Sequence, residues 1–230
     1  MLQTAVVGVG FIGAEHIEAI RRTNLATVAA IVGRSPEQTE QKAKALGIPA
    51  FYTDYDAVLQ DPSIQVIHIC TPNHLHYAMA RKALFAGKHV VCEKPMTMTR
   101  AEAEELLALA RERGLVHAIH FNIRYYPLIR QAKEMIARGD FGKILTARSY
   151  LTWNRPLDYY DGSDWKGTWD KEGGGVLIDQ AIHSIDRVRF MLDSDVEWID
   201  GSVHNYAHKF VKVEDSADAA IMFKNGCLYN

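Results

Sequence analysis

The feature that most constrains this fold is the segment Gly8-Val9-Gly10-Phe11-Ile12-Gly13, which lies between a short apolar run and a helical pattern. Glycines at this spacing, between a strand and a helix, allow a tight turn, a close backbone approach and close helix–strand packing. The free N–H groups at the start of the helix then suit the phosphates of a dinucleotide. We therefore predict that this turn, from Gly8 to Gly13, contacts a dinucleotide cofactor. A plain glycine turn before a helix is the alternative.

The first half of the chain supports the cofactor interpretation, because short apolar runs alternate with helical patterns. Such runs are typical of strands covered on both faces, and the alternation predicts a parallel, doubly wound sheet with right-handed crossovers. We expect this Rossmann domain to span residues 1–122. The expected strands are 4–9, 27–32, 66–70, 89–92 and 116–120, and the expected helices are 12–22, 36–46, 75–86 and 100–113.

The second half has a different pattern, with longer strands and fewer helices. It predicts an α+β domain over residues 123–230 with a large, mostly antiparallel sheet that is open on one side. The expected strands are 144–153, 196–206 and 216–223, and the expected helices are 125–138 and 179–192. Lys224-Asn225-Gly226 is a hairpin turn signal, yet only four residues follow it. We expect this domain to be incomplete at its C-terminus.

The end of the second strand bears on which dinucleotide is bound. An NAD site usually has an acidic residue there, about 20 positions after the glycine turn, to hold the ribose hydroxyls. Gly33 occupies that position, followed by Arg34 and Ser35. The guanidinium of Arg34 suits a 2′-phosphate, and Ser35 could add a hydroxyl donor, so we favour NADP over NAD. The alternative is that Arg34 is a solvated residue and Ser35 only a helix cap.

The loop after residue 70 borders the same edge of the predicted sheet, where ligands bind in doubly wound folds. Thr71 and Pro72 are expected to pass close to the cofactor, and Asn73 to reach it or to cap the next helix. His76, one turn further, is included among the candidate cofactor contacts but is expected at the surface.

Glu93-Lys94-Pro95 follows the predicted strand 89–92 at this same edge. The proline keeps Lys94 out of the α region. A lysine in this place can hydrogen-bond a substrate hydroxyl and stabilise a developing alkoxide. The alternative is a surface lysine in a loop.

A second reactive cluster follows three consecutive glycines, 173–175. Asp179 and His183 are four residues apart and would share one helix face. A carboxylate can orient a histidine that accepts a proton near neutral pH. A metal site or a structural pair are alternatives, but no companion His or Cys has suggestive spacing, so we predict no metal.

Composition narrows the class of protein. The 230 residues are 48% hydrophobic and 23% charged, as in ordinary globular proteins. A net charge of −2 gives no case for binding nucleic acid or a membrane surface. The start lacks the pattern of a signal peptide, no apolar run is long enough to span a bilayer, and the three cysteines lack metal-type spacing. We expect a cytoplasmic protein.

The three motifs in this order resemble the glucose–fructose oxidoreductase, inositol dehydrogenase and rhizopine catabolism (Gfo/Idh/MocA) family, from residue 2 to about residue 226. The resemblance implies that Lys94, Asp179 and His183 are catalytic, and that Glu93, Lys94 and Asn122 contact the cofactor. It also implies substrate contacts from further residues, namely Arg124, Tyr150, Trp153, Arg155 and Trp165.

By this resemblance the protein transfers a hydride between NAD or NADP and a secondary alcohol of a sugar, sugar derivative or cyclitol. It also implies a homo-oligomer, a dimer or tetramer formed through the C-terminal sheet. The alternatives are a glycosidase that uses transient oxidation, and a cofactor-binding regulator without turnover. Family members usually continue for about a hundred residues beyond the point where this chain stops.

Overall fold

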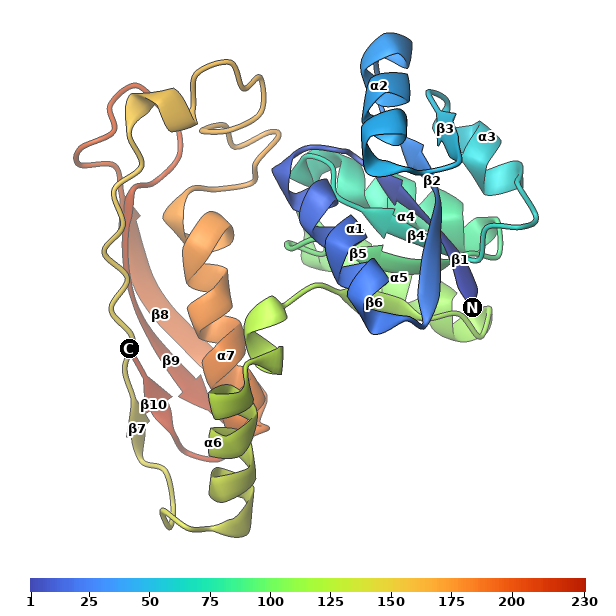
Figure 1. The fold of residues 1–230 in the computed structure, drawn as a ribbon. Coiled ribbons are helices and arrows are strands. Elements are labelled where there is room, and N and C mark those ends of the chain that lie inside the picture. The colour runs from blue at the N-terminus through green and yellow to red at the C-terminus, as the bar shows by residue number, and fades with distance from the viewer. The chain divides into compact units, whose positions relative to one another are not determined.

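The computed structural model describes residues 1–230. The chain divides into two compact units, Met1–His120 and Phe121–Asn230 (Figure 1). None of its helices combines the length and the apolar character needed to cross a membrane.

The N-terminal unit is built on a parallel sheet of six strands in the order β3-β2-β1-β4-β5-β6. This is the strand order of a dinucleotide-binding Rossmann fold, and it confirms the predicted fold class. The strands are β1 (Leu2–Val7), β2 (Ala26–Val32), β3 (Ala50–Tyr52), β4 (Val66–Ile69), β5 (His89–Cys92) and β6 (His117–Ile119).

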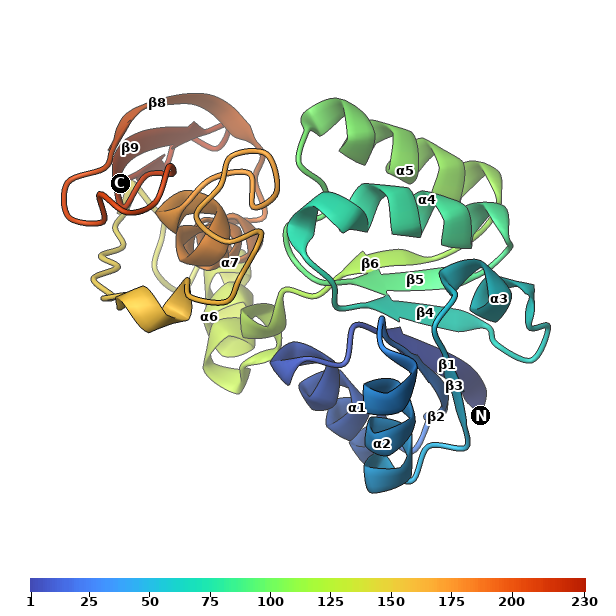
Figure 2. The same ribbon diagram turned by 90° about the horizontal axis from the view of Figure 1, so that it is seen from above.

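Helices cover both faces of this sheet (Figure 2). One face carries α1 (Phe11–Thr23) and α2 (Pro36–Leu46), and the other carries α3 (Tyr55–Gln60), α4 (His76–Phe85) and α5 (Arg100–Glu112). The central strands are buried on both sides, which explains why they read as continuous apolar runs rather than alternating ones. Ile67, Ile69, Leu84, Val90 and Leu106 are all fully buried in the larger of the two cores.

The C-terminal unit pairs its strands in the order β7-β10-β9-β8, with antiparallel β8–β9 and β9–β10 pairs and a parallel β10–β7 pair. The strands are β7 (Thr146–Ala147), β8 (Val196–His204), β9 (Ser216–Phe223) and β10 (Leu228–Tyr229). Helices α6 (Pro127–Arg138) and α7 (Ile182–Leu192) cover one face. Val188, Leu192, Ile221 and Phe223 form the core between helix and sheet.

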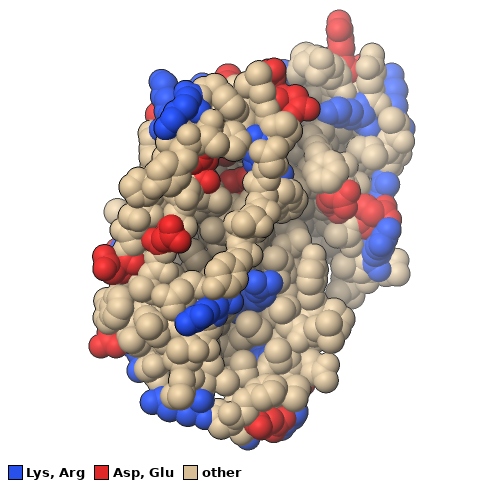
Figure 3. Space-filling view, turned by 90° about the vertical axis from the view of Figure 1, so that its left-hand side faces the viewer, with Lys and Arg blue, Asp and Glu red and all other residues tan.

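The other face of this sheet carries no helix, and uncharged atoms make up most of its surface (Figure 3). A groove runs between residues 148–150 and strands β8 and β9. Trp198 of β8 pairs with Met222 and points to this face, where it stays 44% exposed. Ile199, in contrast, pairs with the core residue Ile221 and points to the helix side. The prediction of a sheet open on one side is therefore confirmed.

Several element predictions were wrong in detail. The strand expected over 144–153 is only Thr146–Ala147, with further backbone hydrogen bonds that join Leu145 to Leu228 and Ser149 to Asn230. The short β3 and α3 were missed, since three and six residues give little periodicity. The helix expected from residue 125 is a 3₁₀ turn, Asn122–Tyr125, followed by α6, and the helix expected from residue 179 opens with a π-helix, Leu177–Ala181.

The burial of α5 gives a direct stability test. Leu106 is fully buried and its neighbour Leu107 is 45% exposed, so the two leucines form a matched pair on one helix. We expect Leu106→Ala to destabilise the N-terminal unit by about 2–5 kcal/mol through lost contacts and a cavity. Leu107→Ala should cost less than about 1 kcal/mol. Hydrogen exchange of the β4 and β5 amides measures the opening of this unit, and equal effects would contradict the assignment of the core.

Candidate functional site

The glycine turn lies where β1 ends and α1 begins, and backbone contacts fix it. A Cβ on Gly13 would lie 2.1 Å from the Gly8 carbonyl oxygen, and a Cβ on Gly8 would lie 2.4 Å from the Cys70 carbonyl oxygen. Gly8 also has φ +87°, which disfavours a side chain. Both positions therefore require glycine, because a neighbouring backbone carbonyl leaves no room for a Cβ atom.

The start of α1 has the properties of an anion site. Gly10 is its N-cap and supplies no side-chain hydrogen bond, and no acidic residue lies in the first turn. The first N–H groups of a helix have no intrahelical acceptor, so they suit a phosphate here. The neighbouring Phe11 and Ile12 are 80% and 41% exposed, which leaves the turn accessible from solvent.

The end of β2 has no room for an acidic side chain at the position usual for NAD sites. A Cβ on Gly33 would lie 2.3 Å from the Oγ1 of Thr39, whose side chain is buried and bonded to the Ser35 carbonyl. Arg34 is exposed. Ser35 is the N-cap of α2, where its side chain accepts a hydrogen bond from the Gln38 N–H.

The loop after β4 places Thr71 and Pro72 at the same edge of the sheet. Asn73 is buried and opens a 3₁₀ turn, Asn73–Leu75. The cap position of α4 is occupied by Leu75, so Asn73 lies within the turn that precedes this helix, and its contact with a cofactor stays a prediction.

The expectation that His76 lies at the surface was wrong. Its side chain is fully buried, and burial lowers its pKa although two carbonyl contacts oppose the shift. Its Nδ1 lies 2.7 Å from the Pro95 carbonyl and its Nε2 lies 2.9 Å from the Thr71 carbonyl. His76 therefore lies between the loop after β4 and the loop that contains Lys94, and its neutral ring donates a hydrogen bond to one of the two carbonyls.

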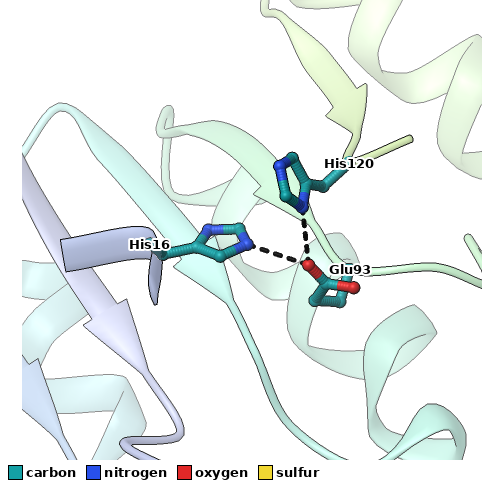
Figure 4. A group of neighbouring side chains, drawn as sticks. All are labelled: His16, Glu93 and His120. Carbon is teal, nitrogen blue, oxygen red and sulfur yellow. Dashed lines mark hydrogen bonds and ion pairs between the residues drawn. The ribbon is translucent and has the colours of Figure 1, made fainter. Parts of the chain in front are cut away.

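Lys94 follows β5 and is half-buried. The preceding Glu93 is held by two histidines, since its Oε1 lies 2.9 Å from His16 Nε2 and 2.7 Å from His120 Nδ1 (Figure 4). Burial alone would raise the pKa of Glu93, but the hydrogen bonds from His120 and His16 lower this pKa to about 2. Glu93 is therefore an anchored carboxylate beside Lys94.

In the C-terminal unit, a buried carboxylate shapes the segment that carries Asp179 and His183. Glu214 is 5% exposed and accepts hydrogen bonds from the Gly175 and Leu177 N–H groups, at 2.8 and 3.2 Å. A Cβ on Gly175 would lie 1.8 Å from the Glu214 carbonyl oxygen. The glycines before the π-helix are therefore needed so that its first turn can lie against Glu214.

Asp179 lies in that π-helix, an element that is frequent at functional sites. Its Oδ2 is 3.4 Å from Arg155 Nη2 and 3.3 Å from the Tyr159 hydroxyl. Burial and then the Asp179 charge raise the pKa of Tyr159, so this phenol keeps its proton at neutral pH. The Arg155 guanidinium also lies 4.4 Å from the ring centres of both Trp153 and Tyr159.

The structure thus gathers Trp153, Arg155 and Asp179 around one small pocket of the C-terminal unit. Tyr150 is 87% exposed and lines the groove over the open sheet instead. Trp165 does not line this pocket, and Asn122 is exposed in its 3₁₀ turn. His183 is the second residue of α7. Its ring lies edge-on to the Phe121 ring, with 6.1 Å between the two ring centres.

Arg124 has a structural partner. Its Nε lies 2.7 Å from Asp186 Oδ2, and its Nη2 bonds the other oxygen of the same buried carboxylate. Hydrogen bonding to Asp186 raises the pKa of Arg124. This pair joins the 3₁₀ turn to α7.

The sequence analysis missed several residues of the C-terminal pocket and several that surround Glu93 in the N-terminal unit. In the C-terminal pocket these are Tyr160, Gln180, His208, Glu214 and Asp215. In the N-terminal unit they are His16, His68 and His120. His120 directly follows a predicted strand, so the rule that ligands lie beyond strand carboxyl ends was the available signal.

The fold and the glycine turn define a protein whose first unit is a dinucleotide-binding Rossmann domain. Residues 2–121 match the model of an oxidoreductase family with an NAD-binding Rossmann fold, and residues 129–230 match the GFO/IDH/MocA C-terminal domain. The chain belongs to the GFO/IDH/MocA oxidoreductase family, as its motifs predicted.

Named relatives are sugar oxidoreductases. The chain is 31% identical over 199 residues to levoglucosan dehydrogenase of Pseudarthrobacter phenanthrenivorans, covering 83% of this chain and 51% of the relative. It is 28% identical over 228 residues to 1,5-anhydro-D-fructose reductase of Ensifer adhaerens, covering 99% and 68%.

Among solved structures, the WlbA dehydrogenase from Bordetella pertussis in complex with NADH and UDP-GlcNAcA has a TM-score of 0.91 at 27% identity, covering 99% of this chain and 70% of the other. The chain thus spans about half to two thirds of the length of the proteins it matches.

Asp215 lines the small pocket, and its ionisation should make the stability of the C-terminal unit depend on pH. Its carboxylate accepts hydrogen bonds from the N–H groups of Tyr206, Ala207 and His208 at 2.7–2.8 Å. Burial opposes ionisation, but these bonds outweigh it and hold the pKa of Asp215 well below its usual value. Because the pKa of Asp215 is lower in the folded state than in the unfolded state, its ionisation stabilises the fold. This stabilisation is fully present above the unfolded-state pKa, about 3.9, and is lost as the pH falls below that value.

Asp215→Asn should therefore destabilise the C-terminal unit at pH 7 by about 1.5–3 kcal/mol, since charge-assisted hydrogen bonds are lost. The difference from wild type should shrink below about pH 4. Thermal unfolding followed by near-UV circular dichroism from pH 2 to 7 measures it. Asp218→Asn, an exposed change on β9, is the control, and a difference independent of pH would contradict the assignment.

Proposed function

We propose that this protein is an NAD(P)-dependent oxidoreductase that transfers a hydride between a nicotinamide cofactor and a secondary alcohol of a sugar, sugar derivative or cyclitol. The observation that carries the proposal is the position of Lys94, directly after β5 at the same sheet edge as the glycine turn after β1. Family membership in both units and the names of the relatives support the substrate class.

The glycine turn and the start of α1 would hold the pyrophosphate, with Thr71, Pro72 and Asn73 beside it. The bound nicotinamide supplies the hydride acceptor or donor. In the direction of oxidation, the Lys94 ammonium hydrogen-bonds the substrate oxygen and stabilises the negative charge that develops there. His183 takes the hydroxyl proton, and Asp179 orients His183.

The supporting residues keep these groups in place. His76 holds the backbone around Lys94 because its ring lies between the Pro95 and Thr71 carbonyls. Glu214 caps the segment that leads to Asp179, and Arg155 and Tyr159 fix the Asp179 carboxylate. Positioning of this kind contributes to the rate because the reacting groups are ordered before the reaction.

We also propose that the protein works in the cytoplasm as a homo-oligomer formed through the open face of its C-terminal sheet. The three cysteines are free thiols, which suits a reducing compartment. Trp198, which is 44% exposed on this face, favours burial against a second copy.

The assigned roles predict the effect of two substitutions. A screen of sugars, inositols and their acids with NAD and NADP first identifies a substrate. Lys94→Ala and His183→Ala should then each lower kcat/KM by about 10²–10⁴-fold, the usual contribution of a charge stabiliser or an acid–base group. Lys44→Ala is the control, because Lys44 is exposed on α2. Near-normal turnover in either catalytic variant would exclude that role.

The cofactor preference is tested at Arg34. The lack of room for a carboxylate at Gly33, together with the exposed guanidinium of Arg34, favours NADP. We expect Arg34→Ala to weaken NADP binding by about tenfold or more, since it removes a charge-assisted contact, and to change NAD binding much less. Fluorescence titration with NADPH and NADH measures both, with the exposed Arg22→Ala as control. Equal losses for the two cofactors would refute the 2′-phosphate contact.

A further inference from the structure

Three side chains of the N-terminal unit bring one potential metal ligand each to the same place (Figure 4). They are His16 Nε2, Glu93 Oε1 and His120 Nδ1, which all lie within 4.8 Å of one another. His16 comes from α1, Glu93 follows β5 and His120 follows β6. The three atoms are therefore held by different parts of one rigid sheet and helix framework.

The distances are close to those of a coordinated set. Ligand atoms bound at about 2.0–2.1 Å to one ion lie about 3.0–3.4 Å apart, depending on its geometry. The two contacts of the Glu93 oxygen are 2.9 Å to His16 and 2.7 Å to His120. An ion needs these contacts to open by a few tenths of an ångström and the two imidazoles to approach each other.

The burial of the three side chains suits a site that a metal can enter. The side chains of His16 and Glu93 are 4% and 13% exposed, so they are fixed, whereas the side chain of His120 is 37% exposed. His120 is the side chain that can turn, and it leaves a route from solvent.

A fourth residue orients the buried ligand. His68, on β4, places its Nδ1 3.0 Å from His16 Nδ1. Histidines that bind metals through one ring nitrogen almost always have a hydrogen-bond partner on the other nitrogen. When His16 coordinates through Nε2, its Nδ1–H donates to His68, so His68 fulfils this role.

We propose that His16, Glu93 and His120 form a binding site for a divalent transition-metal ion of the Zn²⁺ type, with His68 as the residue that orients His16. Two imidazole nitrogens and one carboxylate oxygen are a donor set that suits Zn²⁺, with a position left for water. Glu93 directly precedes Lys94, so the site lies beside the proposed catalytic lysine, but metal binding can be tested without an assay of the oxidoreductase activity. The proposed site differs from the expectation of no metal, which rested on the spacing around Asp179 and His183.

Cobalt(II) titration of the protein without a histidine tag tests the site, because Co²⁺ takes the place of Zn²⁺ and its visible absorption reports coordination. We expect one equivalent of Co²⁺ per chain, displaced by one equivalent of Zn²⁺. His120→Asn should weaken Co²⁺ binding by about tenfold or more, because loss of even a residue that orients a ligand typically costs about that much. His204→Asn, at an exposed histidine of β8, should leave it unchanged.

A second variant and a second measurement keep the test decisive if His120→Asn is unstable. Glu93→Gln should weaken binding in the same way. X-ray absorption of the Co²⁺-loaded wild-type protein should show two imidazole ligands. No saturable binding below about 100 µM Co²⁺, equal affinity in His120→Asn and wild type, or fewer than two imidazole ligands would each overturn the proposal.

Discussion

The contact between Gly13 and the Gly8 carbonyl is the constraint on which the N-terminal unit depends. Because neither residue carries a side chain, α1 starts directly against the end of β1. Its first N–H groups have no intrahelical acceptor and stay available to an anion. The same placement brings His16, one turn later, into contact with His68 and Glu93. One backbone approach thus positions both the cofactor turn and the histidine cluster.

A buried carboxylate has the matching role in the C-terminal unit. Glu214 binds the N–H groups of Gly175 and Leu177, which have no helical partners at the start of the π-helix. Without this acceptor, burying those groups would cost about 1–3 kcal/mol each. The segment with Asp179 is therefore ordered by Glu214, which lies 35 positions later in the chain than Asp179.

Much of the fold could be predicted because its signals are local. The central strands are short apolar runs, and Ser35-Pro36 and Gly47 mark the ends of α2, so the doubly wound sheet and the family followed from the sequence. The long strand expected after Ile144 failed for a physical reason. A strand exists only where a partner pairs with it, and β10 pairs with this segment through Thr146 and Ala147. Apolar character alone does not reveal this.

The sequence by itself determined the glycine turn, the place of Lys94 after a buried strand and the spacing of Asp179 and His183, because each depends on neighbouring residues. Only the tertiary structure decided what surrounds them. It buried His76 between two carbonyls, paired Arg124 with Asp186, placed Arg155 and Tyr159 on Asp179, and joined His16 and His120 on Glu93. These contacts join residues from different elements, and their distances depend on how the elements pack rather than on any local pattern.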